Sequence, residues 1–337
     1  MGIPYRTQRT VKRFFVAVLA AAILLVAACV CGLIWVQRFL VYTADGSVRL
    51  DFDLPPLVAG KPAAPPLLPD VNINFEEDEE IQNPTGELLQ MLGYYVEPEA
   101  LADIPAVIAQ LKELPAGTPV MVDVKNIFGD FFYSSSVSSS RSNKVDTAAM
   151  DELIAYLKQS KLYAVARMPA FRDYDRGLHN IPDGVHHSSG GYLHIDSDGC
   201  YWLHPGREGT ITFLTNIINE LKALGFDEVV LTDFSFPASE NILVNGDRQQ
   251  LLTKAANVLL TACGSDRFAV SFLKTEEFTM PQGRTRMYLS GLDAMEAEEA
   301  AANSGIANTK VNLVFVTELY DTRFDAFSVL RPLSGAH

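Results

Sequence analysis

The sequence predicts an α/β fold, a (β/α)8 barrel preceded by a single transmembrane helix and a linker. Short apolar runs rich in β-branched residues alternate with helical patterns from residue 88 to residue 331. A barrel of this kind usually takes ~250 residues. The apolar runs are continuous rather than alternating, which is typical of strands buried on both faces of a parallel sheet. A doubly wound open sheet is the alternative arrangement of the same units.

Seven segments have the pattern of strands, and an eighth is fainter, so the sequence leaves closure of the barrel open. The expected strands are residues 88–96, 119–125, 162–168, 228–234, 268–272, 286–290 and 311–317, with the faint one at 327–331. The expected helices are residues 104–114, 147–160, 210–224, 248–261 and 292–302. The long connection between residues 168 and 210 would lie over the mouth of a barrel, where barrel enzymes have their sites.

Residues 14–36 contain no charged side chain and no proline. At about 1.5 Å per residue they form a helix of ~35 Å, long enough to span a membrane. Basic residues are concentrated before this segment, so we expect residues 1–13 to be cytoplasmic, residues 14–36 to be a signal anchor and the rest to be extracytoplasmic. The alternatives are a lipoprotein with its lipid on Cys29 and a cleavable signal peptide. The apolar run continues to Val36, which disfavours both.

Residues 37–86 form a linker, and residues 87–337 form the domain that follows it. Seven prolines between Phe52 and Gly86 and an acidic run at 76–80 indicate a semi-rigid spacer. The chain carries 27 basic and 41 acidic residues, a net charge of −14, and no acidic residue precedes position 39. The exported part therefore has a large excess of acidic residues, and such a surface repels phosphate backbones. This excludes nucleic acid as a partner.

The exported part has two cysteines, Cys200 and Cys263, too few for a disulfide framework. A single bridge and two buried thiols both remain open. The Cys and His spacings match no zinc site, and no strand is followed by a glycine-rich nucleotide loop, so we expect neither a metal nor a cofactor. The serine-rich tract 134–142 is most simply a flexible loop.

Charged residues stand at or near the carboxyl ends of three expected strands. Asp123 and Lys125 end the second strand, Arg167 the third and Asp233 the fourth, and Asp173 follows the third more distantly. A charge inside an apolar run is costly unless it is paired, so we expect partners inside the barrel. A buried ion-pair network without catalysis is the alternative. In the loop 179–205, rings beside hydrogen-bonding groups suit the C–H face of a sugar, as in Tyr201, Trp202 and His204.

Four segments resemble, in order and spacing, a bacterial family of glycoside hydrolases with a TIM-barrel fold whose members are often exported. They are VDVKNIFGD (122–130), ARMPAFRD (166–173), WLHP (202–205) and LKALGFDEVVLTDFSFP (221–237), and the resemblance covers roughly residues 88–330. The matching positions are Asp123, Lys125, Gly129, Arg167, Phe171, Asp173, Trp202, Pro205, Gly225, Phe226, Asp227, Glu228, Phe236 and Pro237. The departures are Thr232 for the family's aspartate, Ser235 for its arginine, and Asn126 and Ile127 for its second acid pair.

The resemblance implies hydrolysis of a polysaccharide or envelope glycan. Glycosidases need two carboxyl groups and water but no cofactor. Thr232 cannot supply a carboxyl, so Asp233 would be the strand-four carboxylate, with Asp123 or Asp173 as its partner. Because neighbouring residues on a strand face opposite ways, Asp233 can act only if the strand bulges or has ended there.

Five side chains would then bind the substrate. Lys125 and Arg167 would orient it, with Trp202, Tyr201 and His204 beside them. An inactive barrel that binds a glycan or scaffolds an envelope complex is the alternative function. A purely structural ectodomain is a third, and the sequence identifies no protein partner.

Overall fold

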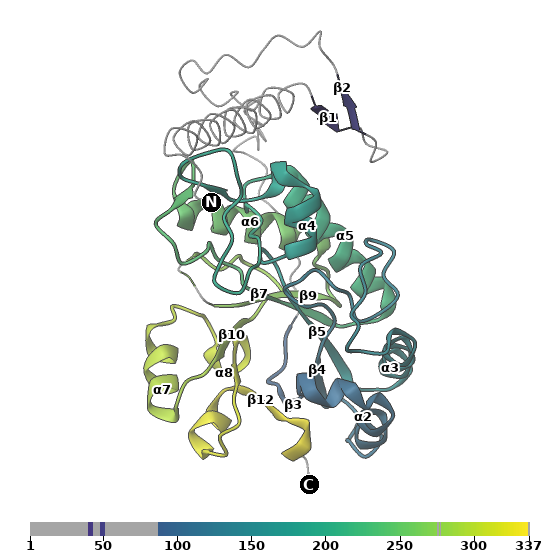
Figure 1. Cartoon of the computed structure of the whole chain (residues 1–337). Helices are drawn as coiled ribbons and strands as arrows, with labels where there is room; N and C mark the ends of the chain where they lie inside the picture. The colour runs from purple at the N-terminus through teal and green to yellow at the C-terminus, as the bar shows by residue number, and fades with distance from the viewer. Residues whose placement is uncertain (1–39, 43–47, 51–86, 275, 277, 336–337) are drawn as a thin grey trace, which may run out of the picture. The chain divides into compact units, whose positions relative to one another are not determined.

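The computed structural model describes residues 40–42, 48–50, 87–274, 276 and 278–335 (Figure 1). The chain divides into two compact units, Met1–Glu79 and Glu80–His337. The described residues of the first unit pair as antiparallel strands β1 (Leu40–Tyr42) and β2 (Val48–Leu50). The expected membrane segment 14–36 and most of the linker 37–86 lie outside the described residues. Within the described ranges, no helix is long and apolar enough to cross a membrane.

The second unit contains a closed barrel of eight parallel strands, so the barrel prediction is confirmed against the open sheet. Closure depends on the strand that was faintest in the sequence, since Val329 pairs with Leu92 across the seam. The strands, in barrel order, are β3 (Leu92–Tyr95), β4 (Pro119–Asp123), β5 (Tyr163–Pro169), β7 (Glu228–Thr232), β9 (Ala269–Leu273), β10 (Met287–Ser290), β11 (Leu313–Val316) and β12 (Ser328–Pro332).

All five expected helices are present, each within a few residues of its predicted bounds. They are α2 (Ile104–Leu111), α3 (Thr147–Gln159), α5 (Glu208–Leu224), α6 (Arg248–Cys263) and α7 (Ala294–Asn303). An aspartate side chain caps the first turn of four of them, satisfying backbone N–H groups that the helix leaves free. Gly225 ends α5 in the left-handed conformation (φ 102°), where glycine is favoured.

The elements that were not predicted are short and lie in connections. They are α4 (Tyr174–His179), α8 (Thr309–Asn312), β6 (His186–His187), β8 (Ile242–Leu243) and the 3-10 turns η1 (Pro98–Ala102), η2 (Ile181–Asp183), η3 (Thr322–Ala326) and η4 (Leu333–Gly335). Segments of two to six residues are too short to show a hydrophobic period.

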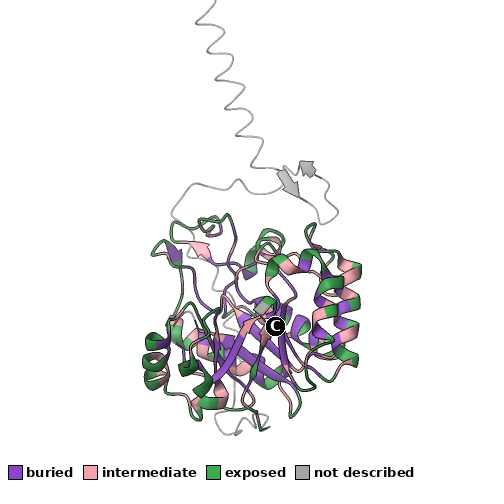
Figure 2. Ribbon diagram, turned by 90° about the horizontal axis from the view of Figure 1, so that it is seen from below, coloured by how far each residue is buried: buried purple, intermediate pink, exposed green. Residues whose placement is uncertain are grey.

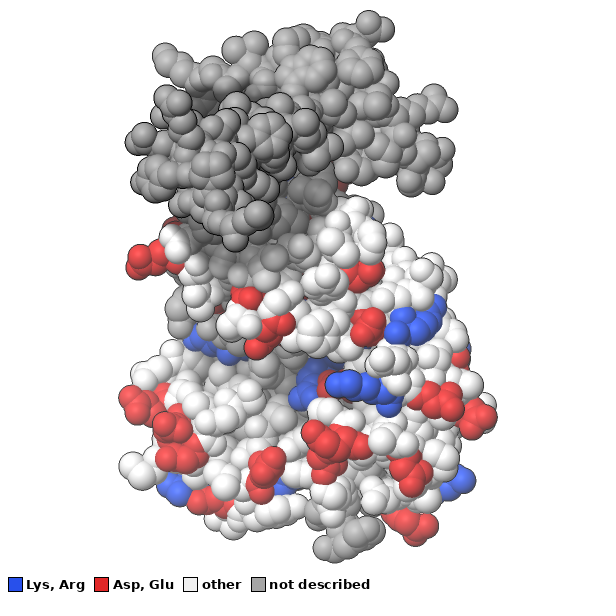
Figure 3. Space-filling model, in the orientation of Figure 1, with Lys and Arg blue, Asp and Glu red and all other residues white. Residues whose placement is uncertain are grey.

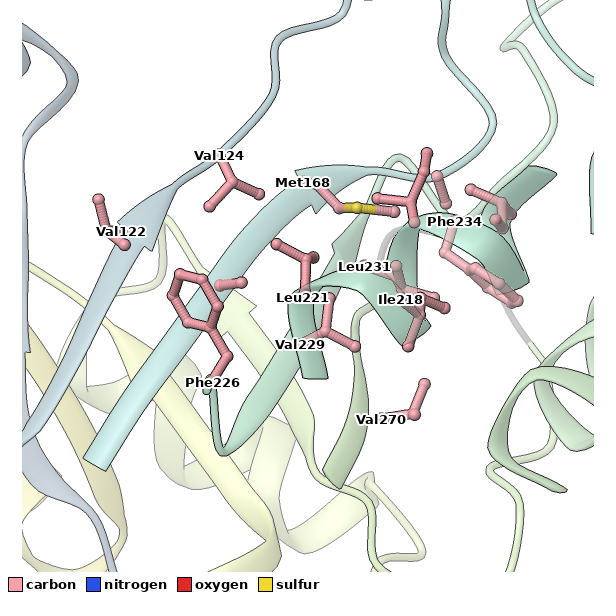
Figure 4. Close-up of a cluster of buried hydrophobic side chains, with 14 of the residues drawn as sticks. Val122, Val124, Met168, Ile218, Leu221, Phe226, Val229, Leu231, Phe234 and Val270 are labelled. Carbon is pink, nitrogen blue, oxygen red and sulfur yellow. The ribbon is translucent and has the colours of Figure 1, made fainter. Parts of the chain in front are cut away.

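The helices cover the barrel from outside and pack against the outward-facing side chains of its strands. In Figure 2 the strands are mostly buried, whereas the outer helix faces are exposed. Figure 4 shows Ile218 and Leu221 of α5 against Val229 and Leu231 of β7. The barrel interior is filled by a second cluster, made of Met91, Met121, Val165, Val230, Tyr288, Val314 and Leu330. The interior is therefore a packed core with no open channel at this level.

Below that cluster, a fully buried ion pair joins Glu228 and Arg286. Glu228 accepts hydrogen bonds from the hydroxyls of Tyr163 and Tyr288, both at 2.9 Å. Arg286 also donates to the backbone carbonyls of Leu89 and Val311. Burial and the neighbouring Glu228 carboxylate raise the pKa of Tyr163 and Tyr288. The Glu228–Arg286 pair at the amino-terminal end of the strands is therefore satisfied within the protein.

Candidate functional site

A pocket of about 540 Å³ opens at the carboxyl ends of β4, β5 and β7. Its lining combines strand-end residues with the long β4–α3 connection. The residues are Pro98, Asp123, Lys125, Asn126, Ile127, Phe128, Asp130, Phe132, Ser142, Asn143, Lys144, Val145, Arg167, Met168, Pro169 and Thr232. Three predicted site residues, Asp123, Lys125 and Arg167, thus share one pocket.

Asp123 and Arg167 form a two-point ion pair between neighbouring strands. They are directly opposite each other in the register of β4 and β5. Arg167 Nε donates to Asp123 Oδ1, and Arg167 Nη2 donates to Asp123 Oδ2 at 2.8 Å. Burial disfavours the guanidinium charge, but the hydrogen bonds and charge of Asp123 outweigh it and raise the pKa of Arg167. Arg167 therefore occupies both carboxylate oxygens of Asp123.

Lys125 and Asp173 form a second pair, and it is almost completely buried. Lys125 Nζ lies 2.6 Å from Asp173 Oδ2, and both side chains are 1% exposed. Asp173 Oδ1 also accepts the backbone N–H of Arg176 at 2.8 Å, which caps α4. The structure therefore places Asp173 in the wall behind the pocket, where its carboxylate neutralises Lys125 and starts a helix.

Asp233 directly follows β7, which ends at Thr232, and its backbone is left-handed with φ 48°. Few non-glycine residues adopt this conformation, although aspartate tolerates it better than most. The turn ends the strict alternation of the strand, but Asp233 is not among the residues that line the pocket. Thr232, which lines the pocket, donates a hydrogen bond from Oγ1 to Asp233 Oδ2 at 3.0 Å.

The environment of Asp233 favours its protonated form. Burial raises the pKa of the carboxyl and outweighs the hydrogen bond from Thr232 and the charges of Arg172 and Lys125, which lower it. The carboxyl thus lies within electrostatic reach of both cationic side chains. A carboxyl group with a raised pKa beside a pocket is a candidate general acid.

The loop 179–205 contributes mainly support. Trp202 is buried, and its Nε1 donates to Asp196 Oδ2 at 2.8 Å, while Arg172 pairs with the same aspartate. His204 is also buried, and its Nδ1 accepts the backbone N–H of Gly206. Burial lowers the pKa of His204 to about 4, so it is neutral. Neither ring lines the pocket, so both hold the loop in place.

The serine-rich tract 134–142 is a connecting loop, and side-chain hydrogen bonds hold it against the rest of the domain. The guanidinium of Arg141 donates to three backbone carbonyls of the tract, those of Ser135, Ser138 and Ser140. Glu220 on α5 accepts hydrogen bonds from the hydroxyls of Tyr133, Ser135 and Ser136. The serine-rich composition of the tract does not reveal that these hydrogen bonds form. They position the tract so that residues 142–145 form one wall of the pocket.

Two exposed aromatic residues beside the pocket were missed. Phe128 is 47% exposed and lines the pocket, and Tyr174 is 38% exposed at the start of α4. Tyr174 stacks on Tyr201, a predicted binding residue, with ring centroids 5.4 Å apart and an interplanar angle of 24°. Phe128 belongs to the motif VDVKNIFGD, in the connection that follows β4, and its position in that motif could have identified it.

Of the two alternatives left open for Cys200 and Cys263, the structure shows two separate buried thiols and no bridge between them. Burial raises the pKa of both thiols to about 11, which keeps them protonated. Within the described ranges, no group of three His, Cys, Asp or Glu side chains is placed to hold a metal ion. On the face drawn in Figure 3, acidic side chains are scattered with basic ones among them, without a continuous basic surface over the described residues.

Residues 105–261 match the model of a family described as "Putative glycosyl hydrolase domain". The match contains β4, β5 and β7 and most of the pocket lining. No curated protein matches the chain.

Solved structures give distant similarities. A hypothetical protein from Ruminiclostridium thermocellum is 16% identical with a TM-score of 0.44, over 58% of this chain and 96% of the other. The α-galactosidase TtGalA from Thermus thermophilus is 14% identical with a TM-score of 0.40, and the match covers 61% of this chain but only 42% of that enzyme. Ega3 from Aspergillus fumigatus, solved with galactosamine, is 12% identical with a TM-score of 0.42, over 74% and 91%. Residues 105–261 are thus similar to a glycosyl hydrolase domain.

Proposed function

We propose that the domain binds a polysaccharide or cell-envelope glycan in the pocket and hydrolyses a glycosidic bond. The position of Asp233 is the observation that carries this proposal. A left-handed turn at the end of β7 takes its carboxyl out of the strand alternation, and Thr232 links that carboxyl to the pocket. Strained or unusual backbone of this kind is concentrated at functional sites.

The two carboxyl groups have different environments, as an acid and its ionised partner require. Burial raises the pKa of Asp233, which suits donation of a proton to the leaving glycosidic oxygen. Asp123 lines the pocket and is paired with Arg167. There it would stabilise the positive charge that develops on the sugar ring, or accept a proton from the attacking water. Lys125 lines the pocket but is paired with Asp173, so it would shape the pocket wall and add positive charge there.

A catalytically inactive, glycan-binding barrel is the second candidate. The specific observation in its favour is that Arg167 occupies both oxygens of Asp123. Asp123 would have to release at least one of these bonds before acting as a base or nucleophile. Thr232 stands where the resembling family has an aspartate, and its hydroxyl binds sugars but does not ionise at working pH.

Release of reducing ends from neutral polysaccharides by the full chain tests the proposal. We expect turnover by the wild type, lowered by a factor of ~100 or more in Asp233→Asn, because the amide cannot donate the proton. Glu240→Gln is the matched control, an exposed carboxyl on the same connection after β7. Wild-type turnover in Asp233→Asn would contradict the proposal. Glycan binding without any turnover by the wild type would support the inactive barrel.

We also infer that the domain lies outside the cell, anchored in the membrane through residues 14–36. Support comes from the uncharged 14–36 segment and the basic residues before it. Fractionation of cells and protease treatment of intact spheroplasts test this inference. We expect membrane-bound protein whose domain is degraded from outside. Release of the domain by Cys29→Ala would instead support the lipoprotein alternative.

A further inference from the structure

We propose that three aromatic residues beside the pocket, Phe128, Tyr174 and Tyr201, form a sugar-stacking surface for a long and uncharged polysaccharide chain. We call these residues the aromatic strip. The inference rests on the proposed function and adds to it the length and the charge class of the ligand.

The strip is continuous with the pocket. Phe128 belongs to both, since it lines the pocket while remaining 47% exposed. The backbone carbonyls of Ile127 and Phe128 accept the N–H groups of Tyr174 and Asp175 at 3.0 and 3.1 Å. The β4 connection and the start of α4 therefore run side by side, and their exposed rings emerge from adjoining backbone.

Tyr174 continues the strip away from the pocket. It stacks on Tyr201, which covers one face of its ring, and the side chain of Tyr174 remains 38% exposed. A stacked pair is a rigid platform, since each ring fixes the orientation of the other.

Two glycines allow this close assembly. A Cβ added at Gly129 would lie 2.5 Å from Asp175 Cβ, and a Cβ added at Gly177 would lie 2.3 Å from Tyr201 Cβ. Gly129 thus lets the β4–α3 connection approach α4, and Gly177 lets α4 approach Tyr201. Only glycine permits both approaches, so the close packing of the strip depends on these two residues.

The chemistry of the strip fits a sugar chain. Flat rings pack against the C–H faces of pyranoses, and tyrosine hydroxyls at the edge can bind sugar hydroxyls. A monosaccharide would be accommodated by the pocket alone, whereas rings that continue outside it suit further sugar units. The chain as a whole carries a net charge of −14, which disfavours a polyanionic glycan.

Affinity electrophoresis of the full chain in detergent tests the inference. The gels contain hydroxyethyl cellulose, galactomannan or glycol chitin as uncharged probes, and carboxymethyl cellulose as a polyanion. We expect at least one uncharged probe to retard the wild type. Phe128→Ala and Tyr174→Ala should each weaken that binding roughly 3- to 10-fold. Tyr174→Phe, which keeps the ring, should bind nearly as the wild type does.

Tyr192→Ala is the matched control. Tyr192 is 57% exposed and stacks on His187, but it does not line the pocket. Its variant should bind as the wild type does.

The outcomes separate the inference from the function on which it rests. Wild-type retardation that persists unchanged in both alanine variants would overturn the strip and leave the glycan proposal standing; the exposed rings would then suit a protein partner. Stronger retardation by carboxymethyl cellulose than by hydroxyethyl cellulose would overturn the uncharged ligand. No retardation of the wild type by any probe would contradict the glycan proposal itself.

Discussion

Thr232 and Asp233 are consecutive residues at the end of one barrel strand, and a 3.0 Å hydrogen bond from the Thr232 hydroxyl ends on the Asp233 carboxylate. Strand geometry would send these two side chains to opposite faces. The left-handed backbone of Asp233 brings them together. The Asp233 carboxyl is therefore bonded to Thr232, a residue that lines the pocket, although Asp233 itself does not line it.

Replacing Thr232 with valine should raise the pKa of Asp233 further. The hydroxyl donates to the charged form of the carboxyl and so lowers its pKa, and valine has the same shape without the donor. We therefore expect an upward shift of the Asp233 pKa in the valine variant. The measurement is NMR titration of the carboxyl carbon of Asp233, which needs no substrate. A downward shift would show that Thr232 does not stabilise the charged form.

The Asp123–Arg167 pair should couple strongly in a double-mutant cycle. Arg167→Leu leaves a partly buried carboxylate unpaired and should lower the free energy of unfolding by about 2 kcal/mol. Adding Asp123→Asn should restore part of that loss, because no unpaired charge remains. Chemical denaturation of the three variants measures the coupling. Simple additivity of the two effects would mean that the pair contributes no stability.

Gly129→Ala should destabilise the domain more than the same change at Gly117. Both glycines are left-handed, with φ 89° and 82°, but only a side chain at Gly129 would collide, at 2.5 Å from Asp175 and 2.6 Å from Asp173. We expect about 3 kcal/mol at Gly129 and about 1 kcal/mol at Gly117, where the backbone strain acts alone. Urea denaturation of the two variants gives the comparison, and equal losses would argue against a close approach at Gly129.

We expect the free energy of unfolding to fall as the pH drops from about 6.5 to about 4, because the buried His204 resists protonation in the folded state. The folded pKa is lowered to about 4 from an ordinary 6.5, so the unfolded chain binds this proton first. The contribution of neutral His204 to the free energy of unfolding is complete above about pH 6.5 and is lost progressively between pH 6.5 and 4. The loss amounts to about 3 kcal/mol. Denaturation at several pH values should show a flatter profile for His204→Gln than for the wild type. An exposed histidine variant, His179→Gln, is the control and should keep the wild-type profile.

Much of the fold follows from local sequence patterns. Continuous runs such as EVVLTDF form strands because both faces are buried, and aspartates at positions such as 146 and 247 mark helix starts. The site was only partly predictable. Strand ends identified Asp123, Lys125 and Arg167, but which acid each cation pairs with depends on how the β4 and β5 connections fold together. The backbone turn at Asp233 and the exposed ring of Tyr174 depend on tertiary contacts, which a single sequence does not display.

The most direct test of the account is a crystal structure of Asp233→Asn with a bound oligosaccharide from a polysaccharide that the wild type binds. The decisive quantity is the distance from the side-chain amide at position 233 to the nearest glycosidic oxygen. We expect hydrogen-bonding distance, about 2.6–3.2 Å, or one bridging water. A sugar chain seated in the pocket with every glycosidic oxygen beyond that reach would contradict it.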